Sequence, residues 1–210
     1  MDRKITALKA QKKNPNRVSV YLEGEFAFGL SRIVAAWLRV GQCLSDEKIT
    51  ALQAQETREK AYQRALGLVS YRPRSESEIH QKLDRAGFDE DTIQAVLARL
   101  KDAGLVQDQT FAETWIENRS TFRPRSQSYL AFELRRKGVS DETIQSAMAQ
   151  AAGDDELAYQ AAQKYARRLE HLEWAEFQKK LTAFLGRRGF SYSTIRPVVS
   201  QVWQESQQEK

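Results

Sequence analysis

A pattern that recurs at a fixed spacing of 51 residues constrains the fold of this 210-residue chain more than any other feature. Leucine, arginine, glycine and isoleucine return in the same order in three copies, without gaps inside a copy. Self-similarity at one period is the mark of a repeat architecture. The aligned residues are Leu83, Leu134 and Leu185; Arg85, Arg136 and Arg187; Gly87, Gly138 and Gly189; and Ile93, Ile144 and Ile195.

Each copy predicts three short helices. In the first two copies an Arg-Pro pair ends the first helix, because a residue that precedes proline avoids the helical region. The serine that follows, Ser75 or Ser126, is placed to cap the second helix. The aligned glycine then ends that helix in a left-handed conformation. Units of this size bury little surface alone and gain stability from their neighbours.

The first 44 residues differ from the repeats. Val18–Leu22 and Phe26–Leu30 each alternate apolar and polar or large and small residues around a Gly-containing turn, which predicts a β-hairpin. Ile5–Leu8 is a further short β-tolerant segment. Ser31 can cap a helix over Arg32–Val40, on which the hairpin is expected to pack, because a lone hairpin is marginal in water. The apolar face of that helix would hold Ile33, Val34, Trp37 and Leu38.

We therefore predict a mainly α chain, with three tandem three-helix repeats that form an elongated curved array and a small N-terminal module of a β-hairpin plus a helix. The expected bounds are 1–44 for the module and 45–105, 106–152 and 153–210 for the repeats. One segment, Gln53–Lys60, is polar nearly all round. A helix of that kind is exposed to solvent, bridges two units or breaks.

Several classes of protein are disfavoured by what the sequence contains. With Cys43, His80 and His171 as the only residues of their types, we expect no disulfide, no metal and no cofactor. There is no Gly-rich phosphate loop, and carboxylates such as Glu76 and Asp89 sit at helix starts, where they complement the helix dipole. We expect no enzyme. No apolar run approaches the ~20 residues that span a bilayer and no apolar signal core opens the chain, so we expect a cytoplasmic protein.

The remaining aromatic and titratable residues have ordinary interpretations. The four tryptophans favour packing in the core or between repeats over stacking on bases. Cys43 favours a small packing role, and both histidines favour solvated helix surfaces. A net charge of +5, concentrated in residues 1–17 and 164–188, indicates an anionic partner.

Basic side chains are the strongest candidates for function. Arg85, Arg136 and Arg187 end second helices, where a cation also simply complements the helix dipole, and we leave both interpretations open. The dipole explains the Arg-Pro-Arg loops less well, because they precede a helix N-terminus. Equivalent loops in stacked repeats would form a basic track. The full set of candidate binding residues is Arg72, Arg74, Arg85, Arg123, Arg125, Arg135, Arg136, Lys137, Arg187 and Arg188.

These motifs resemble a known family. Residues 71–78, Tyr-Arg-Pro-Arg-Ser-Glu-Ser-Glu, with Leu83 and Gly87, resemble the first-repeat signature of the RecX family, regulators of the RecA recombinase. Residues 104–119 resemble its second-repeat entry, and 133–139 match the motif that ends the second helix of that repeat. The likeness covers about 60–200, and the N-terminal module resembles the extension of longer members. Two departures are that Pro124-Arg125-Ser126 replaces a glycine common before the second helix of the middle repeat, and that the third repeat lacks the Arg-Pro loop.

The resemblance implies a non-enzymatic protein of recombinational DNA repair and the SOS response. It would bind the RecA–DNA filament and inhibit the ATPase and strand exchange of RecA. The partners would be the RecA filament and single- or double-stranded DNA, with no membrane, and we expect a monomer. The main alternative is a helical-repeat protein that binds DNA without depending on RecA, because its helix–Gly turn–helix segments superficially resemble helix-turn-helix readers. An enzyme with an unrecognised site is the third hypothesis.

Overall fold

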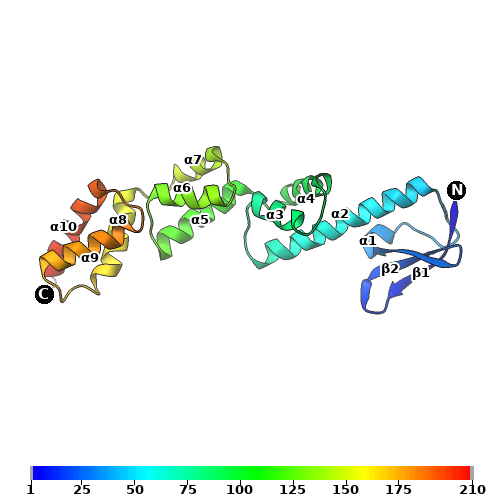
Figure 1. Ribbon diagram of the computed structural model, residues 1–210, viewed down its shortest axis with the longest axis horizontal. Helices are drawn as coiled ribbons and strands as arrows, with labels where there is room; N and C mark the ends of the chain where they lie inside the picture. Colours follow the sequence, from blue (N-terminus) through cyan, green and yellow to red (C-terminus); the bar gives the residue numbers. More distant parts are fainter. Residues whose placement is uncertain (1, 209–210) are drawn as a thin grey trace. The chain divides into compact units, whose positions relative to one another are not determined.

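A computed structural model describes residues 2–208, in which ten helices and four strands are present (Figure 1). The described chain divides into two compact units. Unit 1 runs up to Arg74 and includes Ile79–Val106, and unit 2 comprises Ser75–Glu78 and the residues from Gln107 onward. The predicted mainly helical fold, with three three-helix groups and a small N-terminal strand module, is confirmed.

The N-terminal module is a four-stranded antiparallel sheet in the order β3-β2-β1-β4. Its strands are β1 (Arg3–Gln11), β2 (Asn14–Leu22), β3 (Glu25–Ser31) and β4 (Cys43–Leu44). The predicted hairpin is confirmed as β2–β3. Strand β1 is longer than expected, because an irregularity in its pairing with β2 breaks the simple alternation that sequence reasoning looks for.

Helix α1 (Arg32–Ala35) is much shorter than the predicted helix Arg32–Val40, and that prediction is wrong. The chain leaves the helix because it is needed to extend the sheet. The amide of Gly41 donates to the carbonyl of Ile5, and the amide of Ile5 donates to the carbonyl of Gln42, each at 2.8 Å. Pairing with β1 thus satisfies backbone groups that a longer helix would have satisfied internally.

The side chains around α1 only partly follow the expected apolar face. Val34 and Leu38 are buried, but Ile33 is 58% exposed and Trp37 is 87% exposed. Packing is therefore the wrong interpretation for Trp37. It is also wrong for Cys43, which is exposed.

Helix α2 (Asp46–Tyr71) is continuous through its polar middle. It begins at Ser45, whose side chain accepts from the amide of Lys48 at 3.2 Å. Near its start Leu52 packs in the module core, and further on Ala61 packs in the core of the first repeat. Of the three alternatives for the polar segment, the structure shows a helix that bridges two cores within unit 1.

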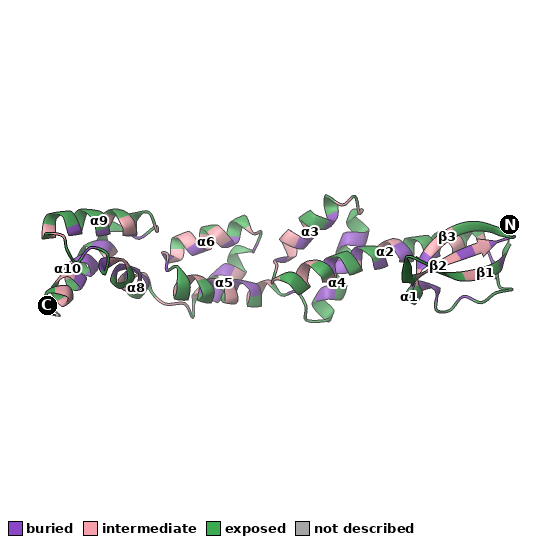
Figure 2. Cartoon of the chain, turned by 90° about the horizontal axis from the view of Figure 1, so that it is seen from below, coloured by how far each residue is buried: buried purple, intermediate pink, exposed green. Residues whose placement is uncertain are grey.

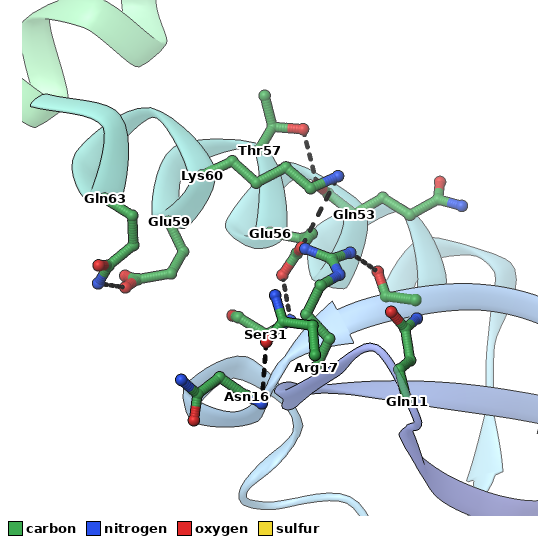
Figure 3. A network of polar contacts seen from close by, with 12 residues as sticks. Gln11, Asn16, Arg17, Ser31, Gln53, Glu56, Thr57, Glu59, Lys60 and Gln63 are labelled. Atoms are coloured by element: carbon green, nitrogen blue, oxygen red, sulfur yellow. Dashed lines mark hydrogen bonds and ion pairs between the residues drawn. The ribbon is translucent and has the colours of Figure 1, made fainter. Parts of the chain in front are cut away.

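A buried carboxylate fixes the sheet on α2 (Figure 3). Glu56 is 3% exposed and pairs with Arg17, with 2.7 Å between Nη1 and Oε1. Its other oxygen accepts from the backbone amide of Ser31. Arg17 also donates to the carbonyl of Gly29 at 3.1 Å, so the ends of β2 and β3 are tied to the middle of the helix.

The remaining helices form the three-helix groups. They are α3 (Glu76–Asp84), α4 (Glu90–Asp102), α5 (Asp108–Phe122), α6 (Gln127–Arg136), α7 (Asp141–Met148), α8 (Asp154–Ala166), α9 (Trp174–Gly186) and α10 (Tyr192–Gln208). The second part of α2 joins α3 and α4, α5–α7 form the second group, and α8–α10 the third. Each group has its own buried cluster on the inward faces of its helices (Figure 2).

Sequence predictions within these groups largely hold. Trp115, Trp174 and Trp203 pack against the cores of their groups, as expected. His171 is exposed, whereas His80 is part-exposed and lies 2.9 Å from a carboxylate oxygen of Glu90. Across the described residues we find no helix with the length and apolar character needed to cross a membrane.

Candidate functional site

The Arg-Pro-Arg-Ser loops end in serines that join one repeat to the next. Ser126 caps α6 by accepting from the amide of Tyr129 at 3.2 Å, and its own amide donates to the carbonyl of Arg188, also at 3.2 Å. At the aligned position in the first copy, the hydroxyl of Ser75 donates to the carbonyl of Lys137 at 2.6 Å. Both serines are fully buried. The loops therefore have a structural role that the sequence did not reveal.

An aspartate from the following repeat completes each of these junctions. The amide of Glu76 donates to Asp108 at 2.9 Å, and the amide of Gln127 donates to Asp154 at 2.7 Å. A carboxylate at a helix N-terminus pairs with amides that lack helical partners and complements the dipole. Sequence reasoning missed these aspartates because they lie 46 residues apart, which departs from the 51-residue period.

The glycine turns of the second and third repeats are the other half of the junctions. Gly189 has φ of +90°, and a Cβ added there would lie 2.6 Å from Ser126 Oγ and 3.1 Å from Tyr129 Cβ. A Cβ on Gly138 would overlap Ser77. A Cβ on Gly87 would meet nothing within 4 Å. Glycine thus supplies the left-handed turn in all three copies and a close approach in two.

The third repeat replaces the serine with an apolar residue. Phe177 stands at the position aligned with Ser75 and Ser126, and it is fully buried in the core of its own repeat. Its ring centroid lies 4.9 Å from that of Trp203. In the third copy this position therefore contributes to the core of its own repeat.

Three of the predicted basic residues come together at the junction of the second and third repeats. Arg188 donates to the carbonyl of Pro124 at 2.8 Å and lies over the ring of Phe184, 4.4 Å from its centroid. Partial burial, with the positive charges of Arg125 and Arg123 nearby, lowers the pKa of Arg188 from its ordinary value. We call Arg123, Arg125 and Arg188 the junction cluster.

The junction cluster is a place where positive charge is held without a compensating carboxylate. None of its three guanidinium groups forms an ion pair with an acid among residues 2–208. Arg125 stacks over Tyr129 at 4.1 Å, and its buried Nε has no hydrogen-bond partner in this part of the chain. Like charges gathered on a preformed surface favour an anion, and planar guanidinium groups match phosphate or carboxylate.

Other predicted residues are engaged within the fold. Lys137 pairs with Glu78 at 2.9 Å and lies 4.3 Å from the ring centroid of Trp115. Arg74 donates from Nε to the carbonyl of Leu68 at 3.0 Å, at the end of α2. These contacts hold helix ends and give the two cations structural roles beside any role in binding.

The last group of candidates is open to solvent. Arg135 forms an exposed ion pair with Asp141 at 2.7 Å, and Arg136 lies 5.8 Å from the ring centroid of Phe132. Arg72 is part-exposed and donates to the carbonyl of the following Pro73. Arg85 and Arg187 are also exposed. The structure brings neither of these two into the junction cluster.

Two aromatic residues that sequence reasoning missed lie beneath the junction cluster. Tyr129 follows Arg125 by four residues, and Phe184 precedes Arg188 by four. Both arginines lie just outside a helix, Arg125 before α6 and Arg188 after α9, so a spacing of four residues across a helix end was the available signal. The described residues contain no group of His, Cys, Asp and Glu that could hold a metal ion.

Comparisons with known proteins agree with this architecture. Family models described as the regulatory protein RecX N-terminal domain and as the first, second and third three-helix domains of RecX match residues 3–45, 61–100, 108–148 and 153–199. A regulatory protein RecX from Bacillus pumilus is 29% identical over 98% of this chain and 80% of its own length. One from Amycolatopsis mediterranei is 34% identical over 73% of this chain and 89% of its own length.

Solved structures support the same assignment. A crystal structure of regulatory protein RecX matches with a TM-score of 0.73 and 28% identity, over 93% of this chain and 98% of the other. RecX from Lactobacillus salivarius matches with a TM-score of 0.61 and 26% identity, over 70% of this chain and 97% of the other. The chain thus belongs to the RecX family of regulatory proteins.

Proposed function

We propose that this protein binds the RecA–DNA filament and inhibits the ATPase and strand exchange of RecA without catalysing a reaction itself. The observation that carries the proposal is the junction cluster of Arg123, Arg125 and Arg188, three cations without a carboxylate partner in the described chain. Membership in a family of regulatory proteins named for RecX supports it. We further propose a monomer that acts in the cytoplasm.

The geometry suits a partner that offers fixed negative charges. The loop that carries Arg123 and Arg125 is held by Ser126, and the turn that carries Arg188 is held by the same serine. Cations positioned in this way lose little conformational entropy on binding, which favours affinity. Phosphates of the DNA in the filament and acidic side chains of RecA are both suitable ligands.

Hydrolysis of ATP by RecA on single-stranded DNA tests the proposal. Sub-stoichiometric addition of the full chain should lower the rate. Substituting Arg123→Gln together with Arg125→Gln should raise the half-inhibitory concentration roughly two- to thirtyfold, since an ion pair near the surface contributes about 0.2–1 kcal/mol and two are lost. The single substitution Arg123→Gln, at an exposed side chain, separates binding from any loss of stability.

A charge-matched control is available on unit 1. Arg64→Gln with Lys82→Gln removes two exposed cations and leaves the junction cluster intact, so inhibition should stay at the level of the parent chain. If the ATPase rate of RecA is unchanged at an equimolar concentration of this protein, the proposal is wrong. Sequence-selective DNA binding that is the same with and without RecA would favour the alternative, a DNA-binding repeat protein independent of RecA.

A further inference from the structure

One face of the N-terminal sheet lies opposite the buried cluster that the sheet forms with α1 and α2. Helices α1 and α2 pack on the face that carries Val18, Val20 and Leu30. Rows of paired residues on the other face follow from the strand register. One row is Lys9, Ser19 and Gly29, and the next is Ala7, Tyr21 and Phe26. We call these two rows the open face.

Aromatic rings stand on the open face among small side chains. Tyr21 and Phe26 are partners across β2 and β3, and their ring centroids lie 6.0 Å apart in an edge-to-face arrangement. Phe26 is 59% exposed. Ala7, which is paired with Tyr21, and Ser19 and Gly29 in the neighbouring row are small. The pair thus places two aromatic rings on one face of the sheet, and aromatic rings are surfaces on which bases stack.

One cation lies beside these rings, and two more lie in the turn between β1 and β2. Lys9 Nζ lies 4.9 Å from the centroid of Tyr21. Lys12 and Lys13 form the exposed turn that joins β1 to β2. Arg17 is paired with Ser31, outside these two rows, and its guanidinium approaches Gly29 and pairs with Glu56.

The distribution of charge along the chain distinguishes this module from the repeats. Residues 2–44 contain eight Lys or Arg and three Asp or Glu, whereas residues 45–210 contain twenty-five of each. The whole net charge of +5 therefore belongs to the module. A module with this excess of positive charge attracts a polyanion. The rest of the chain has no net charge and adds nothing to that excess.

We propose that the open face binds single-stranded nucleic acid, with bases stacked on Tyr21 and Phe26 and phosphates bound by Lys9, Lys12 and Lys13. A base can stack on one of these rings only if the face of the base is free. Bases of a single strand have free faces, whereas bases inside a duplex do not. The positive charges of Lys9, Lys12 and Lys13 can neutralise the phosphates of such a strand. This site is distinct from the junction cluster, lies in unit 1, and acts without RecA.

Fluorescence anisotropy of labelled oligonucleotides with the full chain, in the absence of RecA, tests the site. The probes are a single-stranded DNA and a single-stranded RNA of about 16 nucleotides, a length that covers known site sizes, and a DNA duplex of the same length. Both single strands should bind better than the duplex. The ratio between DNA and RNA then identifies which strand the site prefers.

Two variants separate stacking from charge. Phe26→Ala should weaken binding of single strands by roughly fivefold to 150-fold, the effect of losing one stacked base. Phe26→Trp keeps a ring and should retain binding, which excludes a folding defect as the cause. Lys12→Gln with Lys13→Gln should reduce the slope of log affinity against log salt by roughly 0.7 for each phosphate that the variant no longer neutralises.

Matched controls come from unit 2. Phe122→Ala removes a ring that is 74% exposed, and Lys179→Gln with Lys180→Gln removes two exposed lysines. Neither should alter affinity. The proposal is overturned if Phe26→Ala weakens binding no more than Phe122→Ala, or if the duplex binds as tightly as the single strands. Because RecA is absent, such a failure leaves the proposed inhibition of RecA untouched.

Discussion

Replacing Gly189 with alanine should open the junction between the second and third repeats. The left-handed backbone at this position costs alanine about 1–2 kcal/mol. The new Cβ would also lie 2.6 Å from Ser126 Oγ and 3.1 Å from Tyr129 Cβ, distances too short to persist. Overpacking of this kind costs typically about 1–3 kcal/mol. The junction should therefore be destabilised by about 2–5 kcal/mol in total.

Gly87→Ala is the control that separates the two costs. Gly87 is aligned with Gly189 and has φ of +84°, but a Cβ there meets nothing within 4 Å. It should lose only the backbone contribution of about 1–2 kcal/mol. The difference between the variants thus isolates the close approach, and about 1–3 kcal/mol corresponds to a roughly fivefold to 150-fold change in the opening equilibrium.

Hydrogen exchange measured by mass spectrometry reports this opening directly. The amide of Ser126 donates to the carbonyl of Arg188, and the amide of Gln127 donates to Asp154, so a peptide over these residues loses protection when the junction opens. Gly189→Ala should speed exchange in that peptide, and Gly87→Ala should not. Equal exchange in the two variants would refute the prediction. It would mean that Gly189 is needed only for its left-handed turn and not for the close approach to Ser126.

Three further predictions concern stability. Phe177→Ala should lower the free energy of unfolding of unit 2 by about 3–5 kcal/mol, measured with urea, because a buried ring leaves a cavity. Glu56→Gln should destabilise the module by about 3 kcal/mol in thermal unfolding, because Arg17 loses the partner of a largely buried pair. The pKa of Asp89 is lowered by hydrogen bonds from the amide and hydroxyl of Thr92, so its contribution is present above its ordinary pKa and lost as pH falls through the lowered one. Denaturant unfolding from about pH 5 to about pH 2 should show a loss in the parent that is smaller in Asp89→Asn, which does not titrate.

The repeat architecture could be predicted because its signals are local. A glycine that needs a left-handed turn, a serine before a helix and a leucine on its inner face each act within a few residues. The 51-residue period then carried the same interpretation to all three copies. Caps at Ser126, Asp89 and Ser140 are present as this reasoning expects.

The N-terminal module was predicted less fully because distant pairing decides it. Trp37 and Ile33 lie at helical spacing, but α1 ends at Ala35 and the chain turns to pair with β1. A backbone hydrogen bond to a strand far earlier in the chain leaves no local mark in the sequence. The sequence also did not predict that Glu56 is buried, because its partners Arg17 and Ser31 lie far earlier in the chain.

The candidate site could be predicted less fully than the repeats and more fully than the N-terminal module. The arginines in the two loops could be selected from their charge and from their place before a helix. The sequence could not predict which of the basic residues come together, because the approach of Arg188 to Pro124 depends on how one repeat meets the next. Lys137, which was selected because it ends a second helix, pairs with Glu78 and is largely withdrawn from solvent.

The junctions give the array a direction. Each of the first two copies contributes a buried serine to the turn of the copy that follows, and the third offers Phe177 instead. A duplicate of the second copy, inserted after it, would both receive and contribute such a serine and could lengthen the protein. A duplicate of the third copy placed after it would meet a buried aromatic ring at the position from which Ser75 donates its hydroxyl in the first copy. Whether a copy can receive another of the same kind after it therefore depends on the residue aligned with Ser75.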